Sequence, residues 1–279
     1  MNLKDIHTPG PIGVFDSGYG GLTILEGIRK LMPGNDYLYL GDNARAPYGT
    51  RSFEVVYQFT RQAVVKMFEL GCQLVILGCN TASAKALRSI QQLDLPQIAP
   101  DRRVLGVIRP TVEAIGDYTK SGHIGIFGTP GTIRSESYNI EIAKLYPDYV
   151  TTGQECPLWV PLVENREFDN PGADYFVEKY IDTLLHRDPL IDTALLGCTH
   201  YPLLLRKIRK HMPPQVRIVT QGDIVARSLR DYLERHPEMA ARVSRNGSTE
   251  YLTTESAEKF SEMGSLFLAK DIKARTITL

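Results

Sequence analysis

Uninterrupted apolar runs alternate with amphipathic stretches along most of the chain. The apolar runs, which predict buried strands, lie at 12–16, 37–41, 73–78, 104–108, 123–128, 157–163, 191–197 and 216–220. The stretches between them have helical periodicity and lie at 21–31, 52–70, 81–92, 132–145, 172–187 and 202–211. Strands of this kind separated by helices are typical of parallel sheets covered on both faces. The pattern therefore predicts an α/β fold.

The two halves of this pattern resemble each other. The apolar runs that begin at Ile12 and Ile124 both start with Ile-Gly and both lead into glycine-rich turns. A Gly-Cys pair followed by two polar residues ends the apolar run at 78–81 and again at 197–200. Open α/β sheets bind ligands at the carboxyl ends of their strands. The duplication therefore predicts two pseudo-symmetric lobes, each a mostly parallel sheet flanked by helices, with the active site in the cleft between them.

The chain continues beyond the second half of the duplication. Its last part contains an amphipathic stretch at 222–235, a strand-like run at 250–253 and a helical stretch near 255–264. We expect this tail to pack back on the first lobe, which would then be discontinuous. The first lobe would comprise 1–108 plus 221–279, and the second lobe would comprise 109–220. The two crossings, near 108–110 and 219–222, would form a hinge.

The amino-acid composition excludes some classes of binding partner. The 279 residues are 43% apolar and 23% charged, as in an ordinary soluble globular protein. Lys and Arg together number 32, as do Asp and Glu, so no overall field favours nucleic acid or an anionic membrane. No apolar run approaches the roughly 20 residues that span a bilayer. The expected partner is a small molecule, with neither nucleic acid nor a membrane.

The N-terminus and the cysteines indicate in which cellular compartment the protein is expected. Residues 1–7 lack the apolar segment of a secretion signal. Four cysteines in a chain of this length do not resemble a disulfide framework. Cys72, at a helix–strand turn, and Cys156, which has no counterpart in the other half, are interpreted as structural. We expect a cytoplasmic protein.

The repeated cysteines, Cys79 and Cys198, suggest proton transfer. A single cysteine after a strand is more often a small buried hydrophobe, but the matched pair in both halves favours a function. A base on one face of a substrate and an acid on the other would suit racemisation at a carbon. A free thiol has a pKa of about 8.5, so each sulfur needs help to ionise. Repulsion within one site also favours one thiolate beside one thiol.

Three side chains are candidates for that help. Asp16 ends the first strand and could accept a proton from Cys79. His200 lies two residues after Cys198 and could do the same there, as could Glu164 at the end of the apolar run 160–163. His200 and Glu164 could equally be a packed histidine and a solvated loop carboxylate.

Glycine-rich and polar residues flank the same strand ends. The turn 16–21 opens a helix and offers backbone N–H groups to an anion, while Asp16 could contact an ammonium group. The turn 128–132 is its weaker counterpart. Asn80, Thr81 and Thr199 could hydrogen-bond a substrate or could simply cap helices.

Two other function classes fit part of this pattern. Cys79, Cys198 and His200 could bind zinc, although the chain contains no Cys-x-x-Cys. A two-lobed binding protein without catalysis would leave the matched thiols unexplained. Racemisation explains both thiols and is the leading hypothesis.

Five ordered segments make the chain similar to the glutamate racemase family. They are 14–23, 47–50, 79–83, 160–164 and 196–202. The resemblance runs from about Ile12 to the C-terminus. It implies interconversion of L- and D-glutamate without a cofactor or a metal, and supply of D-glutamate for peptidoglycan. Aspartate racemase, with the same fold, is the nearest alternative.

The resemblance also implies roles for particular residues. Cys79 would take the proton of the D-enantiomer and Cys198 that of the L-enantiomer. Asp16 would assist Cys79, while Glu164 and His200 would assist Cys198. The substrate's charged groups would be held by Asp16, Ser17, Tyr48, Gly49, Asn80, Thr81, Thr199 and His200. Family members are commonly dimers, so we expect a homodimer.

The chain departs from the family pattern at a few positions. These are Gly78, Arg109, the pair Asn165 and Arg166, and the triplet Gln221–Asp223. Most of them lie at the expected hinge and lobe edges. They concern lobe movement and regulation more than the reaction.

Overall fold

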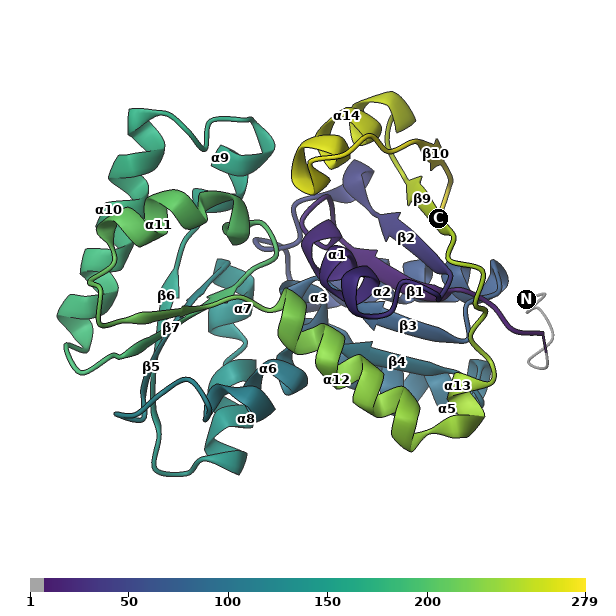
Figure 1. The fold of residues 1–279 in the computed structure, drawn as a ribbon, viewed down its shortest axis with the longest axis horizontal. Helices are drawn as coiled ribbons and strands as arrows, with labels where there is room; N and C mark the ends of the chain where they lie inside the picture. Colours follow the sequence, from purple (N-terminus) through teal and green to yellow (C-terminus); the bar gives the residue numbers. More distant parts are fainter. Residues whose placement is uncertain (1–7) are drawn as a thin grey trace.

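The computed structural model describes residues 8–279 and contains two parallel β-sheets. The first has six strands in the order β10-β9-β2-β1-β3-β4 and the second has four in the order β6-β5-β7-β8. The strands of the first sheet are β1 (Ile12–Asp16), β2 (Tyr37–Gly41), β3 (Leu74–Leu77), β4 (Arg103–Gly106), β9 (Thr249–Thr253) and β10 (Ala274–Thr276). Those of the second are β5 (His123–Gly128), β6 (Val150–Glu155), β7 (Thr193–Gly197) and β8 (Arg217–Val219). We call the sheets with their covering helices the first and second lobes (Figure 1).

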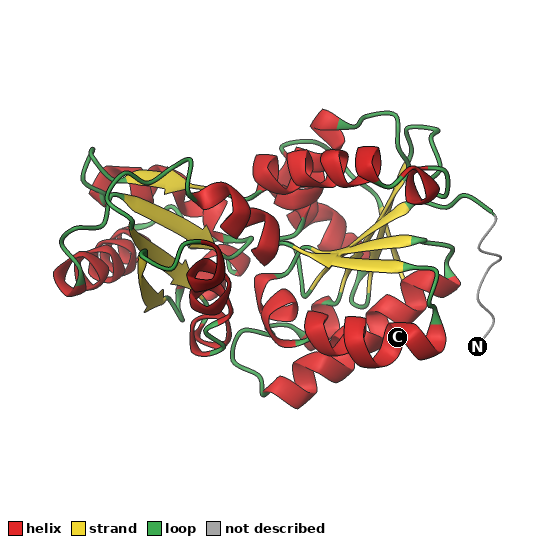
Figure 2. Cartoon of the chain, turned by 90° about the horizontal axis from the view of Figure 1, so that it is seen from below, coloured by secondary structure: helices red, strands yellow, loops and turns green. Residues whose placement is uncertain are grey.

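Helices cover both faces of each sheet (Figure 2). Around the first sheet lie α1 (Leu22–Leu31), α2 (Phe53–Glu69), α3 (Asn80–Lys85), α4 (Leu87–Ser89), α5 (Leu95–Ile98), α12 (Gly222–Arg235), α13 (Pro237–Ala240) and α14 (Ala257–Leu268). Around the second lie α6 (Ile108–Ile115), α7 (Pro130–Arg134), α8 (Ser137–Leu145), α9 (Trp159–Glu164), α10 (Pro171–Arg187) and α11 (Leu205–His211). The α/β fold of two parallel, helix-flanked sheets expected from the sequence is confirmed. Among residues 8–279, no helix combines the length and apolarity that crossing a membrane needs.

Each sheet separates two apolar clusters because alternate side chains of a strand point to opposite faces. In β1, Ile12 and Val14 belong to one cluster and Phe15 to the other. In β5, Ile126 and Phe127 divide between two clusters in the same way. Both faces of each sheet are thus buried, which explains why the strands have no polar alternation.

The tail closes the first sheet. Strand β9 pairs in parallel with β2, with Tyr39 opposite Tyr251, and β10 adds to the outer edge of β9. Helix α12 packs against α1. The strand-like run expected at 250–253 is confirmed. The lobe boundaries at 108/109 and 220/221 stay a prediction, and residues 1–7, on which the absence of a secretion signal was argued, lie outside the described residues.

The prediction of a strand at 157–163 is wrong. Residues 159–164 form helix α9, and the strand of this region is β6 at 150–155. A short apolar run suits a buried helix as well as a strand, and Pro161 inside it cannot donate to a ladder. Strand β6 was not predicted, because it lies at the edge of its sheet and contains mostly polar residues.

The helix expected at 132–145 is interrupted. Helices α7 and α8 replace it, and Glu136 between them has a φ of 54°, in the left-handed region. The helix expected at 81–92 is likewise divided, into α3, α4 and a π-helical turn at Ile90–Asp94. The turn at 201–204 is a 3-10 segment that precedes α11.

We predict that Leu252→Ala lowers the free energy of unfolding by about 2–5 kcal/mol, because its fully buried side chain packs in a cluster built mainly from the first hundred residues. Leu190→Ala, at a leucine that is 63% exposed, is the matched control and should change stability by less than about 0.5 kcal/mol. Urea unfolding measures both. Equal stability of the two variants would contradict the packing of the tail into the first lobe.

Candidate active site

The expected site residues surround a cavity of about 80 Å³ between the two lobes. Its wall is built from residues that follow the carboxyl ends of β1, β3, β5, β6 and β7, joined by the loop after β2. The expected residues on this wall are Ser17, Tyr48, Gly49, Cys79, Asn80, Thr81, Glu164, Cys198, Thr199 and His200. Because they follow the carboxyl ends of strands, ten residues from distant parts of the chain lie together around one cavity.

Cys79 is the thiol of the first lobe. It caps the N-terminus of α3, where its sulfur accepts the Ala82 N–H at 3.4 Å and lies 3.5 Å from Ser17 Oγ. The side chain is almost fully buried. Burial, together with the negative charge of Asp16, raises the pKa of Cys79 to about 12. In this closed arrangement Cys79 is therefore a protonated thiol.

Cys198 is the thiol of the second lobe and has a basic partner. His200 Nδ1 lies 4.0 Å from its sulfur, and His200 Nε2 lies 3.1 Å from Glu164 Oε1. Burial alone would lower the pKa of His200, but its bonds to Cys198 and Glu164 prevail and raise that pKa to about 10. The imidazole can therefore hold a proton taken from the thiol, while the carboxylate fixes the ring.

Asp16 lies outside the cavity wall, although its side chain is fully buried. Its carboxylate accepts the Gly18 N–H at 2.8 Å and the Thr199 hydroxyl at 3.2 Å. Burial is the main cause that raises the pKa of Asp16, and the nearby His200 opposes it. Asp16 acts on Cys79 through its charge, and its hydrogen bond to Thr199 ties the first lobe to the second.

Gly20 packs closely against the second lobe. A β-carbon on this residue would lie 2.3 Å from Thr199 Oγ1 and 2.5 Å from His200 Nδ1. Thr23 adds a hydrogen bond to the Thr199 carbonyl at 3.3 Å. Only glycine leaves room for the loop after β1 to lie against the Cys198 turn.

The remaining polar residues of the wall are held by buried partners. Tyr48 donates a hydrogen bond to Asp42, and the Gly49 carbonyl accepts the Gly131 N–H at 2.7 Å across the lobes. Thr81 Oγ1 lies 3.0 Å from Thr129 Oγ1. These bonds hold the wall in the present arrangement of the two lobes.

Eight lining residues were not among the expected site residues, and Thr129 and Cys156 are two of them. Thr129 follows β5 at the place that Ser17 holds after β1, so the internal repeat contained the signal. Cys156 follows β6, the strand that was misplaced, and it was interpreted as structural. Its buried sulfur lies 3.6 Å from the Gln154 carbonyl. Its position on the wall could not be predicted, because the strand that precedes it had been expected at 157–163.

Helix α14 of the tail contacts His200 of the second lobe. The ring of Phe267 meets that of His200 edge-on at 5.8 Å between centroids. Arg166, whose φ of 60° lies in the left-handed region, reaches across the lobes to form an ion pair with Glu262 at 2.6 Å. Arg166, one of the departures from the family pattern, thus contributes to the contact between the lobes.

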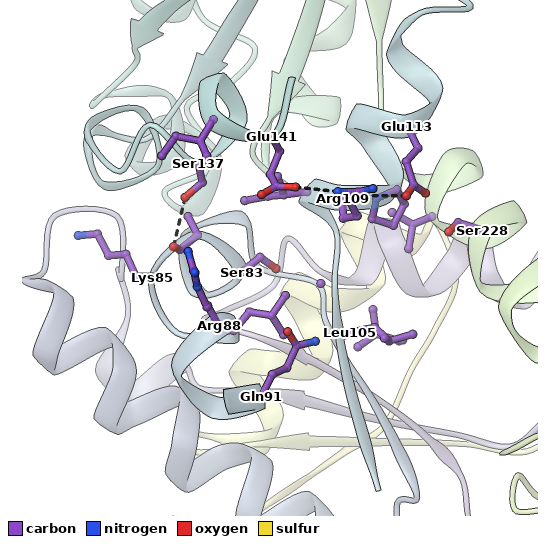
Figure 3. A pocket seen from close by; sticks show the side chains of 18 of the residues that line it. Ser83, Lys85, Arg88, Gln91, Leu105, Arg109, Glu113, Ser137, Glu141 and Ser228 are labelled. Carbon is purple, nitrogen blue, oxygen red and sulfur yellow. Dashed lines mark hydrogen bonds and ion pairs between the residues drawn. The ribbon is translucent and has the colours of Figure 1, made fainter. Parts of the chain in front are cut away.

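A larger hollow of about 770 Å³ lies between the lobes outside the thiol cavity. Arg109 on its wall bonds Glu113 at 2.7 Å and Glu141 at 3.0 Å, and Ser137 donates to the Ala84 carbonyl across the lobes (Figure 3). None of the expected site residues lines it. In residues 8–279, no group of three or more His, Cys, Asp and Glu side chains is placed to hold a metal ion.

The thiol cavity can be compared with known proteins. A sequence model of the Asp/Glu/Hydantoin racemase family matches residues 22–229. The chain belongs to this family.

Individual racemases match over nearly the full length. Glutamate racemase from Ruegeria sp. (strain TM1040) is 41% identical over 271 residues, which cover 94% of this chain and 97% of that protein. The crystal structure of a glutamate racemase isoform from Bacillus anthracis has a TM-score of 0.86 at 33% identity and covers 97% of this chain and 98% of that one. Glutamate racemase from Francisella tularensis, solved in complex with D-glutamate, has a TM-score of 0.85 at 29% identity with the same coverage. These racemases confirm the resemblance and the fold expected from the sequence.

We predict that Glu164→Gln lowers the pKa of His200 from about 10, because the carboxylate is, after Cys198, the second of the two partners that raise this pKa against the effect of burial. The imidazolium would then lose its proton at a lower pH. Histidine NMR titration measures the shift, with His200→Gln assigning the signal. Glu113→Gln, at an exposed ion pair remote from the cavity, is the control. An unchanged titration in Glu164→Gln would show that this carboxylate does not sustain the charge.

Proposed function

We propose that this chain interconverts L- and D-glutamate through a two-thiol proton transfer at the α-carbon, without a cofactor. The observation that carries the proposal is that Cys79 and Cys198, one from each lobe, line a single cavity. The family and the glutamate racemases that match along the whole chain support glutamate as the substrate. Aspartate is the alternative substrate, and turnover of each amino acid under the same conditions distinguishes them.

The two thiols have different surroundings, and this suits opposite roles in one turnover. From L-glutamate, the Cys198 sulfur would give its proton to His200 and then, as thiolate, take the α-proton. The Cys79 thiol would add its own proton to the opposite face of the carbanion, which yields D-glutamate and a Cys79 thiolate. The high pKa of Cys79 supports its role as the acid in this direction.

The reverse direction needs a proton acceptor for Cys79, and we assign this role to Asp16. Burial raises the pKa of Asp16, which makes its carboxylate a stronger base than an exposed one. Its contact with Thr199 gives it a second task, because the bond forms only while the lobes are together. Asp16 thus combines assistance to Cys79 with closure.

The polar residues of the wall would hold the charged groups of glutamate. We assign this role to Ser17, Tyr48, Gly49, Asn80, Thr81, Thr199 and His200 on the wall, and to Asp16, which lies outside the wall and would act through its charge. A cavity of about 80 Å³ is far smaller than the roughly 300–1,000 Å³ of open ligand pockets. Glutamate would therefore enter when the lobes separate at the crossings near 108–110 and 219–222, between the proposed segments 1–108 plus 221–279 and 109–220.

The proposal also covers the use of the product, the cellular location and the oligomeric state. D-glutamate from this reaction would supply peptidoglycan synthesis. All four cysteines are free, and thiols that carry protons must stay reduced, which supports a cytoplasmic location. We further propose a homodimer, in keeping with the family.

We predict that Cys79→Ser and Cys198→Ser each lower racemisation at least about 10²–10⁴-fold in both directions, because every turnover needs both an acid and a base. Circular dichroism of L- and D-glutamate solutions measures the rates, with a chelator present throughout. Cys72→Ala, in the core of the first lobe, is the matched control and should retain activity. Near-normal turnover by either serine variant would overturn the two-thiol mechanism, and turnover that is lost with the chelator and restored by zinc would favour the metal alternative.

We also predict that Gly20→Ala lowers kcat/KM for glutamate at least about tenfold, because the added methyl group occupies the space of Thr199 and His200. Gly34→Ala, where a β-carbon meets no atom within 4 Å, is the control and should be neutral. Steady-state kinetics in both directions checks the pair. Equal activity of the two variants would show that closure tolerates a wider gap at Gly20.

A further inference from the structure

Three buried side chains behind the cavity form a closed ring of hydrogen bonds. Tyr138 Oη donates to Asn80 Oδ1 at 2.5 Å, Asn80 Nδ2 donates to Gln221 Oε1 at 2.7 Å, and Gln221 Nε2 donates to Tyr138 Oη at 2.9 Å. Each side chain is at most 3% exposed. Every member donates and accepts once within the ring, so the bonds run in a single direction and reinforce one another.

Thr111 sets the direction of the ring. Its hydroxyl donates to the Val107 carbonyl at 2.7 Å and therefore accepts the bond from Gln221 Nε2 at 2.8 Å. This contact requires the amide nitrogen of Gln221 on the side of Thr111 and Tyr138. The amide oxygen is then turned towards Asn80.

The members of the ring come from parts of the chain that move relative to one another when the lobes separate. Asn80 begins α3 of the first lobe, directly after Cys79, whereas Tyr138 lies on α8 of the second lobe. Gln221 and Val107 precede α12 and α6 at the two crossings of the chain, where the lobes meet (Figure 1). The ring can close only when both lobes and both crossings are in their present arrangement.

We propose that Gln221 and Tyr138 are positioning residues that orient the Asn80 amide for substrate when the lobes close. Asn80 lines the cavity, and the ring engages its oxygen and one of its two N–H groups. The other N–H is thereby aimed for a carboxylate of the amino acid. Separation of the lobes withdraws Tyr138 and releases the amide, so the donor is presented only in the closed state. This inference rests on the proposed function.

Position 221 needs a side chain that both donates and accepts, and this requirement provides the test. An ionised glutamate there accepts only, whereas a protonated one donates once and accepts once. Of the groups around it, Asn80, Thr111 and Val107 do not titrate. Burial, with a smaller contribution from the charge of Cys198, raises the pKa of Tyr138, so the phenol stays protonated. In Gln221→Glu the ring is therefore complete at low pH and broken at high pH.

The experiment compares Gln221→Glu, Tyr138→Phe and the double variant with the wild-type chain from about pH 6 to 9, through kcat and KM for glutamate in both directions. We expect Tyr138→Phe to lower kcat/KM about tenfold, mainly through KM, as the loss of a hydrogen bond to a binding group does. For Gln221→Glu, kcat/KM relative to wild type should fall as the pH rises. In the double variant this pH dependence should vanish, because the ring is already broken. Tyr146→Phe, which removes a hydroxyl that follows α8 and donates to the Glu113 carbonyl outside the ring, is the matched control.

The outcomes separate the ring from the proposed function. An active wild-type chain with a flat pH ratio for Gln221→Glu, or with unchanged KM in Tyr138→Phe, overturns the positioning role. Should Tyr138→Phe fail to fold, the pH ratio of Gln221→Glu still decides. If the wild-type chain binds glutamate without racemising it, the proposed function fails, and calorimetric affinities of the same variants test the ring. A chain that neither binds nor converts glutamate overturns both.

Discussion

The burial of ionisable side chains between the lobes is the constraint on which the rest of the structure depends. Burial keeps Cys79 protonated, strengthens the interactions that charge His200, and raises the pKa of Asp16. The same three groups in water would have ordinary pKa values and weak mutual effects. The residues after the strand ends, Gly20 against Thr199 and His200, and Phe267 of the tail against His200 all pack around this space.

Closure also explains why so many contacts of the site cross from one lobe to the other. Asp16 meets Thr199, Thr81 meets Thr129, and Gly49 meets Gly131. In the proposed opening of the lobes each of these bonds would be lost. Substrate binding would then be coupled to the pKa values of the thiols, because the arrangement that surrounds the substrate is also the one that buries the thiols.

The sequence predicted the parts of the structure that repeat. The alternation of apolar and amphipathic stretches specified parallel sheets, and the duplicated Gly-Cys phrase placed both thiols at one site. The contacts between the halves could not be predicted, because they depend on how two separately folded surfaces meet. Asp16 was expected beside Cys79, yet its hydrogen bonds reach Thr199. The apolar run 157–163 was misassigned because local hydrophobicity does not distinguish a buried helix from a buried strand.

The order of strands in the first sheet has a consequence for synthesis on the ribosome. Strand β2 is flanked by β1, made about twenty residues earlier, and by β9, made some two hundred residues later. While the second lobe emerges, with all its strands contiguous in the chain, the β2 edge and the α1 face of the first lobe lack their partners. An unpaired strand edge beside an uncovered apolar face is a site for association with other chains. The nascent protein therefore exposes a surface prone to association while the whole second lobe is translated. That surface is covered only when the C-terminal segment has been made.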